Sequence, residues 1–125
     1  MNKNWKKRDE IIGVQEKKYS GGIVSFEGLS LETLEKMVKN NFIDLDDAQN
    51  EAPSAGEILE FMKANPRFTC HGYAVSIERS DYAVMLEGVE LTEKPTQLEK
   101  DNFLKMFRQA DEFEMDNDGC RSWYD

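Results

Sequence analysis

The sequence predicts a single α+β domain, and three observations favour that class. The chain has 125 residues, a length at which one hydrophobic core is sufficient for stability. Its apolar residues change along the chain between a helical spacing and a strand spacing. The predicted strands also come in adjacent pairs, which favours an antiparallel or mixed sheet with helices packed on one face. We therefore expect the element order β-β-α-α-β-β-α.

Two short apolar segments predict the first pair of strands, over residues 10–15 and 22–26. Ser20, Gly21 and Gly22 predict the turn between them, because glycine adopts positive φ without a steric penalty. A strand pattern follows these glycines, whereas a phosphate-binding loop leads into the N-terminus of a helix. The segment is therefore not expected to bind phosphate.

Two helices are predicted next, one over about 31–41 and one that starts after Ser54 and ends before residue 65. Ser30 precedes the first and can act as its N-cap, and the apolar residues that follow have helical spacing. The second begins after Ser54, and Glu57 stands three residues beyond that serine, which is the spacing of a capping box. Asn65 and Pro66 end this helix.

Residues 68–77 and 82–91 give the strongest strand signal, because both are rich in β-branched and aromatic residues. The four polar residues between them predict an antiparallel hairpin. A third helix is expected over 96–113, where Thr96 and Glu99 repeat the capping spacing. Residues 1–9 are then expected to be a flexible basic arm, residues 10–113 the domain, and residues 114–125 an acidic tail.

The charge balance restricts the possible partners. The chain holds 25 acidic and 16 basic residues and has a net charge of −9. Such a surface repels phosphate backbones, so nucleic-acid binding is disfavoured. No apolar run has the length of about 20 residues that a membrane-spanning helix requires. The only cysteines are Cys70 and Cys120, which is compatible with a reducing, cytoplasmic location.

The most specific chemical motif lies near the C-terminus and resembles an EF-hand calcium loop over about twelve residues. The candidate ligands are Glu114, Asp116, Asp118, Ser122 and Asp125, with Gly119 at the position of the tight turn. Calcium requires several carboxylate oxygens around such a turn. The segment departs from the motif because Glu114 replaces the usual aspartate and Arg121 occupies an apolar position. Calcium binding is therefore an alternative function, with a solvated acidic tail as the simpler interpretation.

A second alternative is a small enzyme that uses His71, the only histidine. Its neighbour Cys70 points to the opposite face of a strand, so these two cannot form a thiolate-imidazole pair. A pair of His71 with Cys120, or with an acid, remains open. No paired-ligand spacing predicts a zinc site, and no cofactor is expected.

Recognition of another protein is the function that the sequence favours. Trp5, Trp123 and Tyr124 are expected to be exposed aromatic anchors, and the acidic surface is expected to complement a basic partner. We therefore expect a small cytoplasmic accessory or regulatory protein that works by protein-protein contact. The sequence does not predict its oligomeric state.

Overall fold

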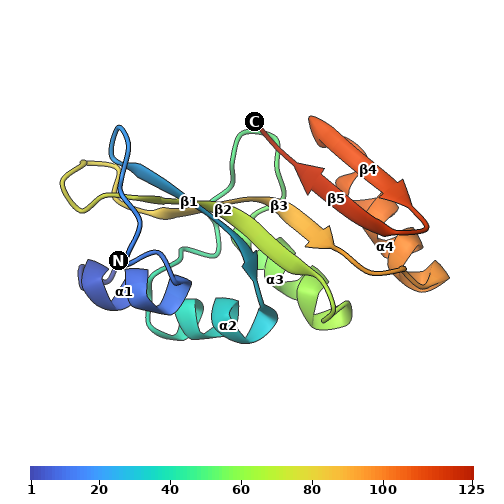
Figure 1. Cartoon of the computed structure of the whole chain (residues 1–125), viewed down its shortest axis with the longest axis horizontal. Helices are drawn as coiled ribbons and strands as arrows, with labels where there is room; N and C mark the ends of the chain where they lie inside the picture. Colours follow the sequence, from blue (N-terminus) through green and yellow to red (C-terminus); the bar gives the residue numbers. More distant parts are fainter.

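The computed structural model describes residues 1–125 as helices packed against one five-stranded sheet (Figure 1). In chain order the elements are α1 (Trp5–Ile12), β1 (Ile23–Leu29), α2 (Leu31–Lys39), α3 (Ala55–Ala64), β2 (Thr69–Val75), β3 (Val84–Leu91), α4 (Gln97–Phe107), β4 (Glu112–Asp116) and β5 (Gly119–Trp123). The α+β class is therefore confirmed. The predicted element order is wrong, because the chain begins with a helix and ends with an unpredicted hairpin.

The strand order in the sheet is β1-β2-β3-β5-β4, and all neighbouring strands are antiparallel. The predicted central hairpin is β2 and β3, although both strands are shorter than expected. β5 lies between β3 and β4, so β1 and β4 are the two edge strands. In Figure 1, α2 and α3 lie below β1 and β2, and α4 lies behind β4 and β5.

The strand predicted over residues 10–15 is wrong, because helix α1 covers the first half of that segment and a turn follows it. The side chain of Asn4 accepts a hydrogen bond from the amide of Lys7, which caps the helix, and Gly13 ends it with φ at 88°. Ile11 and Ile12 suggested a strand when considered alone. Residues 1–9, expected to be a flexible arm, contain the start of this helix.

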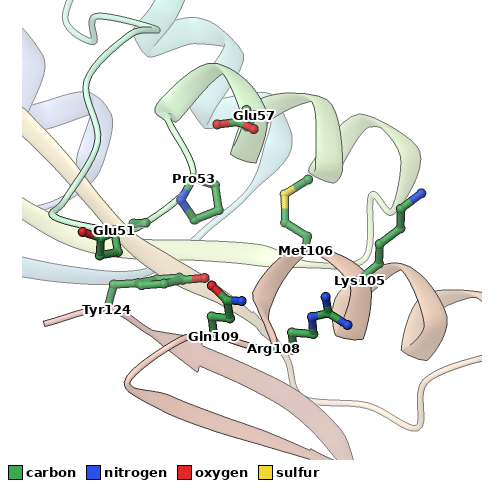
Figure 2. Close-up of a pocket in the computed structure, with 9 residues that line it drawn as sticks. Glu51, Pro53, Glu57, Lys105, Met106, Arg108, Gln109 and Tyr124 are labelled. Atoms are coloured by element: carbon green, nitrogen blue, oxygen red, sulfur yellow. The ribbon is translucent and has the colours of Figure 1, made fainter.

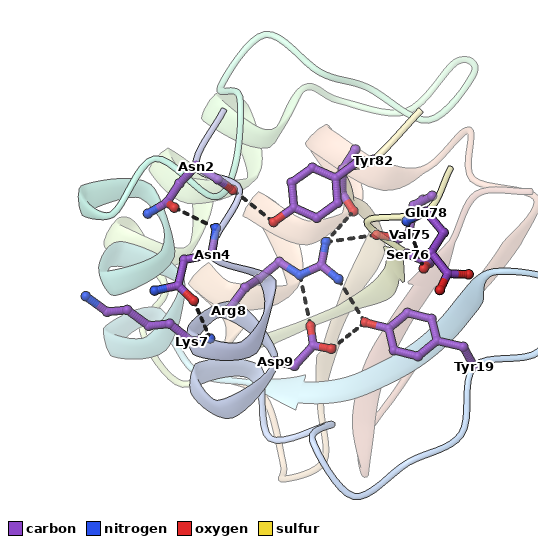
Figure 3. A network of polar contacts seen from close by, with 11 residues as sticks. Asn2, Asn4, Lys7, Arg8, Asp9, Tyr19, Val75, Ser76, Glu78 and Tyr82 are labelled. Atoms are coloured by element: carbon purple, nitrogen blue, oxygen red, sulfur yellow. Dashed lines mark hydrogen bonds and ion pairs between the residues drawn. The ribbon is translucent and has the colours of Figure 1, made fainter. Parts of the chain in front are cut away.

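Arg8 attaches α1 to the sheet, and its side chain is only 1% exposed (Figure 3). It donates hydrogen bonds to Asp9 Oδ1 at 2.9 Å, to the carbonyl of Val75 at 2.9 Å and to the hydroxyl of Tyr19 at 2.8 Å. Its guanidinium also lies 4.6 Å from the ring centroid of Tyr82. A buried guanidinium requires this number of partners, because an unpaired buried charge is strongly destabilising. The arm therefore contains one of the anchors of the fold.

The acidic tail predicted over residues 114–125 is also wrong, because most of it forms the β4–β5 hairpin. Helix α4 ends at Phe107, so the last residues of the predicted third helix belong to β4. Along β4, exposed and half-buried residues alternate, as expected for a strand with one face against the protein. Asn117 and Asp118 form its two-residue turn. The alternation of acids with Phe113 and Met115 is the signal in the sequence that the tail interpretation overlooked.

Both capping boxes form as predicted, at Ser54 with Glu57 and at Thr96 with Glu99. They place α3 and α4 so that a cluster of phenylalanine side chains fills the space between the helices and the sheet. Phe61 lies edge-on to Phe68 and to Phe107, with both pairs of ring centroids 5.0 Å apart. Phe103 stacks on Phe113 with a centroid distance of 4.9 Å. This contact fixes β4, and with it the hairpin, against α4.

None of the helices combines the length and the apolar composition that are needed to cross a membrane.

Candidate functional site

A pocket of about 270 Å³ lies where the β4–β5 hairpin meets the end of β3. Four of the residues that line it carry carboxyl groups, and one carries a guanidinium. These are Glu90, Glu114, Asp116, Asp118 and Arg121. We call this site the acidic pocket.

Strand register brings three of these side chains together. Arg121 on β5 lies opposite Glu90 on β3 and opposite Glu114 on β4. Residues that are directly opposite in antiparallel strands project from the same face of a sheet. The sheet therefore places one basic and two acidic side chains from three strands side by side.

The turn of the hairpin adds the remaining acids. Oδ1 of Asp116 accepts hydrogen bonds from the amides of Asp118, at 2.7 Å, and Gly119, at 3.2 Å. This local bonding holds the turn closed. Glycine is required at position 119, since a Cβ atom there would lie 2.3 Å from the carbonyl oxygen of Leu91. The close approach of β5 to the end of β3 thus depends on this residue.

The acidic pocket carries more negative than positive charge. Arg121 lies 3.8 Å from a carboxylate oxygen of Glu90 and 3.7 Å from one of Glu112. Glu114, Asp116 and Asp118 have no ion pair with a basic side chain. One guanidinium shared by two acids leaves these three carboxyl groups without a basic partner within the chain, so their charges can attract a basic group from outside.

The structure brings together three of the five calcium-ligand candidates, since Glu114, Asp116 and Asp118 line the acidic pocket. It separates the other two from them. Ser122 is fully buried, and its hydroxyl accepts a hydrogen bond from the amide of Val89 at 3.1 Å. The backbone of Asp125 bonds to the side chains of Asn50 and Asp111.

The chain contains no group of three or more His, Cys, Asp or Glu side chains with the geometry to hold a metal ion. An EF-hand loop wraps its ligands around the ion, whereas here the same segment is two paired strands with a two-residue turn. The structure thus gives no calcium-binding arrangement at these residues.

His71 is the residue on which a catalytic alternative depends, and it is buried with 6% exposure. Its Nε2 atom donates a hydrogen bond to the backbone oxygen of Ser122 at 2.8 Å. Burial lowers the pKa of this imidazole, and the hydrogen bond to the Ser122 backbone opposes that shift only in part. The lowered pKa favours the neutral form of the ring, and the hydrogen bond fixes its position between strands.

The two thiols are also unsuited to nucleophilic chemistry. Burial raises the pKa of Cys70 to about 12 and also raises the pKa of Cys120, so the thiolate is disfavoured at both. Cys120 lies opposite Leu91 and Met115 in the sheet, and the charges that affect it are those of Glu99, Asp116 and Lys100. The structure does not bring this thiol and His71 together as a reactive pair.

A second pocket, of about 350 Å³, lies between the end of α4 and the loop that precedes α3 (Figure 2). Its charged residues are two acids, Glu51 and Glu57, and two bases, Lys105 and Arg108. Oε1 of Glu57 accepts a hydrogen bond from the amide of Ser54, which stabilises the start of α3. Because its opposite charges offset one another, this pocket does not favour a ligand of one charge.

The aromatic anchors differ from the expectation. Tyr124 lines the second pocket but is buried, with only 4% exposure. Trp123 is half-buried on β5, and Trp5 is 37% exposed. Tyr124 is therefore part of the core and not an exposed contact residue.

Comparison of the chain with protein-family models, curated proteins and solved structures finds no match.

The sequence interpretation missed Glu90 and Arg121 as members of the acidic pocket. Both lie in strands, and only the order β3-β5-β4 makes them neighbours of Glu114. The local signal for the hairpin was present in the alternation of residues 112–116. The pairing of β5 with β3 has no comparable local signal, because it joins segments about thirty residues apart.

Proposed function

We propose that this protein is a small accessory or regulatory protein of the cytoplasm that binds a basic partner protein through the acidic pocket. The observation that supports this most strongly is the set of three carboxyl groups, from Glu114, Asp116 and Asp118, that have no basic partner within the chain. A lysine or arginine side chain of another protein would supply the missing positive charge.

The magnitude of the attraction suits a reversible contact. Two unit charges 4 Å apart attract by about 1 kcal/mol in water and by about 4 kcal/mol near a protein surface. Several carboxyl groups that converge on one cation therefore provide useful affinity and specificity even when each pair is partly solvated. The half-buried Trp123 on the same hairpin offers an adjacent aromatic contact.

The state of the cysteines supports a reducing compartment. Cys70 and Cys120 are both buried and free, and the domain therefore owes no stability to a disulfide. This is what a cytoplasmic protein requires.

Affinity capture with charge-reversed variants tests the proposal. The wild-type protein, Glu114→Lys and Glu35→Lys serve as baits in a lysate, and the retained proteins are identified by mass spectrometry. Glu35 is exposed on α2, at the other end of the molecule from β4 (Figure 1). Its reversal therefore changes the net charge equally without touching the acidic pocket.

We expect a basic partner that the wild type and Glu35→Lys retain and Glu114→Lys loses. Raising the ionic strength from about 0.01 M to about 1 M shortens the screening length from about 30 Å to about 3 Å, so it should release the same partner. Retention of identical proteins by all three baits, or retention that is unaffected by salt, would contradict the proposal.

A further inference from the structure

We propose that the free edge of β4 accepts an extended segment of the basic partner as a sixth strand, in which lysine or arginine residues alternate with apolar residues. This inference rests on the proposed function and specifies how the partner is held. It adds backbone hydrogen bonds to the charge attraction at the acidic pocket.

The backbone of β4 has unused hydrogen-bonding groups. The two-residue turn makes Asp116 and Gly119 a hydrogen-bonded pair, and by alternation Glu114 also bonds to its partner on β5. The N–H and C=O groups of Phe113 and Met115 therefore point away from β5. Neither residue makes a backbone hydrogen bond in a turn, loop or cap. These groups are available to an additional strand.

The opposite edge of the sheet does not offer the same surface. β1 has a register shift between Phe26 and Leu29, and Gly28 within it has φ at 69°. At its start, Ile23 and Ser20 form a bridge that folds the preceding turn against the strand. Such irregularity protects an edge from pairing. β4 pairs with β5 without a register shift, so it is the more regular of the two edges.

The charges along β4 specify the kind of segment that fits. Glu112, Glu114 and Asp116 are exposed and alternate along the strand, so they share one face. A second copy of this chain paired through β4 would place acids beside acids, which is destabilising. Basic side chains at alternate positions of an added strand would instead lie directly opposite these acids.

The other face of the same edge is apolar. Phe113 and Met115 are half-buried there, and the exposed Leu104 of α4 extends this surface. Leu104 follows Lys100 by one helical turn, and the Lys100 side chain reaches Asn117 in the turn of the hairpin. The helical spacing therefore places Leu104 on the side of α4 next to the hairpin. Apolar side chains between the basic residues of the added strand would cover it.

Two synthetic peptides of the same composition test this inference. One is the alternating sequence Lys-Val-Lys-Val-Lys, and the other is Lys-Lys-Lys-Val-Val, both with blocked termini. Each is titrated into isotope-labelled protein, and amide shifts and amide hydrogen exchange are recorded by NMR. The Glu114→Lys and Glu35→Lys variants are titrated in parallel.

We expect the alternating peptide to bind about tenfold more tightly, because only its lysines can face all three acids of β4. It should slow exchange at the amides of Phe113 and Met115 and leave the amides of β1 unchanged. Glu114→Lys should abolish the difference between the peptides, and Glu35→Lys should preserve it.

Equal binding of the two peptides, with dependence on Glu114 but without slower exchange at Phe113 and Met115, would overturn strand addition and leave the acidic pocket as a charge-binding site. Binding of neither peptide would overturn the proposed function as well. Slow exchange at Phe113 and Met115 in the free protein, together with a dimeric mass, would show that a second copy occupies the edge and would also overturn the inference.

Discussion

The imidazole of His71 on β2 bonds to the backbone oxygen of Ser122 on β5, and it crosses Gly88 on the strand between them. The absence of a side chain at Gly88 lets β5 approach β3 at this point. Ser122 is adjacent to Arg121, which lines the acidic pocket. His71 is therefore a positioning residue for the hairpin, and its hydrogen bond links the centre of the sheet to the candidate site.

Gly88→Ala should destabilise the protein strongly. The added Cβ would lie 2.0 Å from the backbone oxygen of Ser122 and 3.0 Å from His71 Nε2, so either β5 or the imidazole must move. We expect a loss of at least about 3 kcal/mol in the free energy of unfolding, the upper end of the usual cost of overpacking. Urea denaturation measures it.

Gly28→Ala is the matched control, because Gly28 has φ at 69° and open space around it. This variant should lose only about 1–2 kcal/mol in the free energy of unfolding, which is the cost of a left-handed conformation for a residue with a side chain. An equal or smaller loss in Gly88→Ala than in this control would contradict the close approach of β5 to β3.

Acidification should weaken the fold through His71. Burial lowers the pKa of His71 in the folded state below the ordinary value of 6.5. As the pH falls through that value, the unfolded chain binds the proton first, so folding stability decreases. The effect is absent at higher pH, where the imidazole is neutral in both states.

The difference in unfolding free energy between the wild type and His71→Gln, followed from about pH 8 to about pH 5, isolates this contribution. The amide group of glutamine can donate but does not titrate in this range. The advantage of the wild type should therefore shrink as the pH falls. A difference that is independent of pH would contradict the burial of His71.

Replacement of Arg8 by alanine should cost about 3–5 kcal/mol, because it leaves the carboxylate of Asp9 buried without its charge partner. Arg8→Lys should rescue only part of this loss, since an ammonium cannot reproduce the planar fork that reaches Asp9, Val75 and Tyr19. The exposed neighbour Lys7 provides the control, and Lys7→Ala should change stability by less than about 0.5 kcal/mol. Thermal or urea denaturation of the three variants ranks them, and similar losses for Arg8→Ala and Lys7→Ala would disprove the anchoring role.

The ion pair between Arg67 and Glu99 should stabilise the start of α4 in a pH-dependent way. Nη2 of Arg67 donates a hydrogen bond to Oε1 of Glu99 at 2.6 Å. This bond lowers the pKa of Glu99 from 4.5 to about 2. Because the folded pKa is depressed, the stabilisation is present above about pH 4.5 and is lost as the pH falls through about 2. Arg67→Ala should lower the free energy of unfolding at pH 7, because it removes the charged partner of Glu99.

Urea denaturation of the wild type and Arg67→Ala at pH 7 and at about pH 2 checks this contribution. The two proteins should differ much less at the lower pH. A difference of the same size at both values would show that Arg67 acts through packing and not through Glu99.

The sequence predicted those elements whose signals are local. The capping spacing predicted the starts of α3 and α4, at Ser54 with Glu57 and at Thr96 with Glu99. Both capping boxes are present. The strand predicted over residues 10–15 is wrong because Ile11 and Ile12 are compatible with a strand as well as with a helix. The packing of this segment depends on Arg8, and a buried charged side chain of this kind is rare in protein cores. The acidic composition after Phe113 suggested a solvated tail. The alternation of acidic and apolar residues over the same segment, which forms β4, was the more informative signal.

The candidate site was predictable only in part, for a related reason. Glu114, Asp116 and Asp118 are close in sequence, so their shared position at the hairpin could be anticipated. Glu90 and Arg121 join them through the pairing of β3 with β5, which depends on long-range contacts and on the space at Gly88. A binding site assembled from three strands cannot be derived from the spacing of one segment.

The most direct test of the account is to locate the carboxyl groups that contact the captured partner. A carbodiimide couples carboxylates to lysine amines that touch them, and mass spectrometry of the cross-linked complex identifies the residues joined. We predict cross-links from Glu114, Asp116 or Asp118 to lysines of the partner. Cross-links confined to acids elsewhere, such as Asp46 or Glu51 in the loop before α3 or Glu35 on α2, would contradict the assignment of the acidic pocket as the binding site.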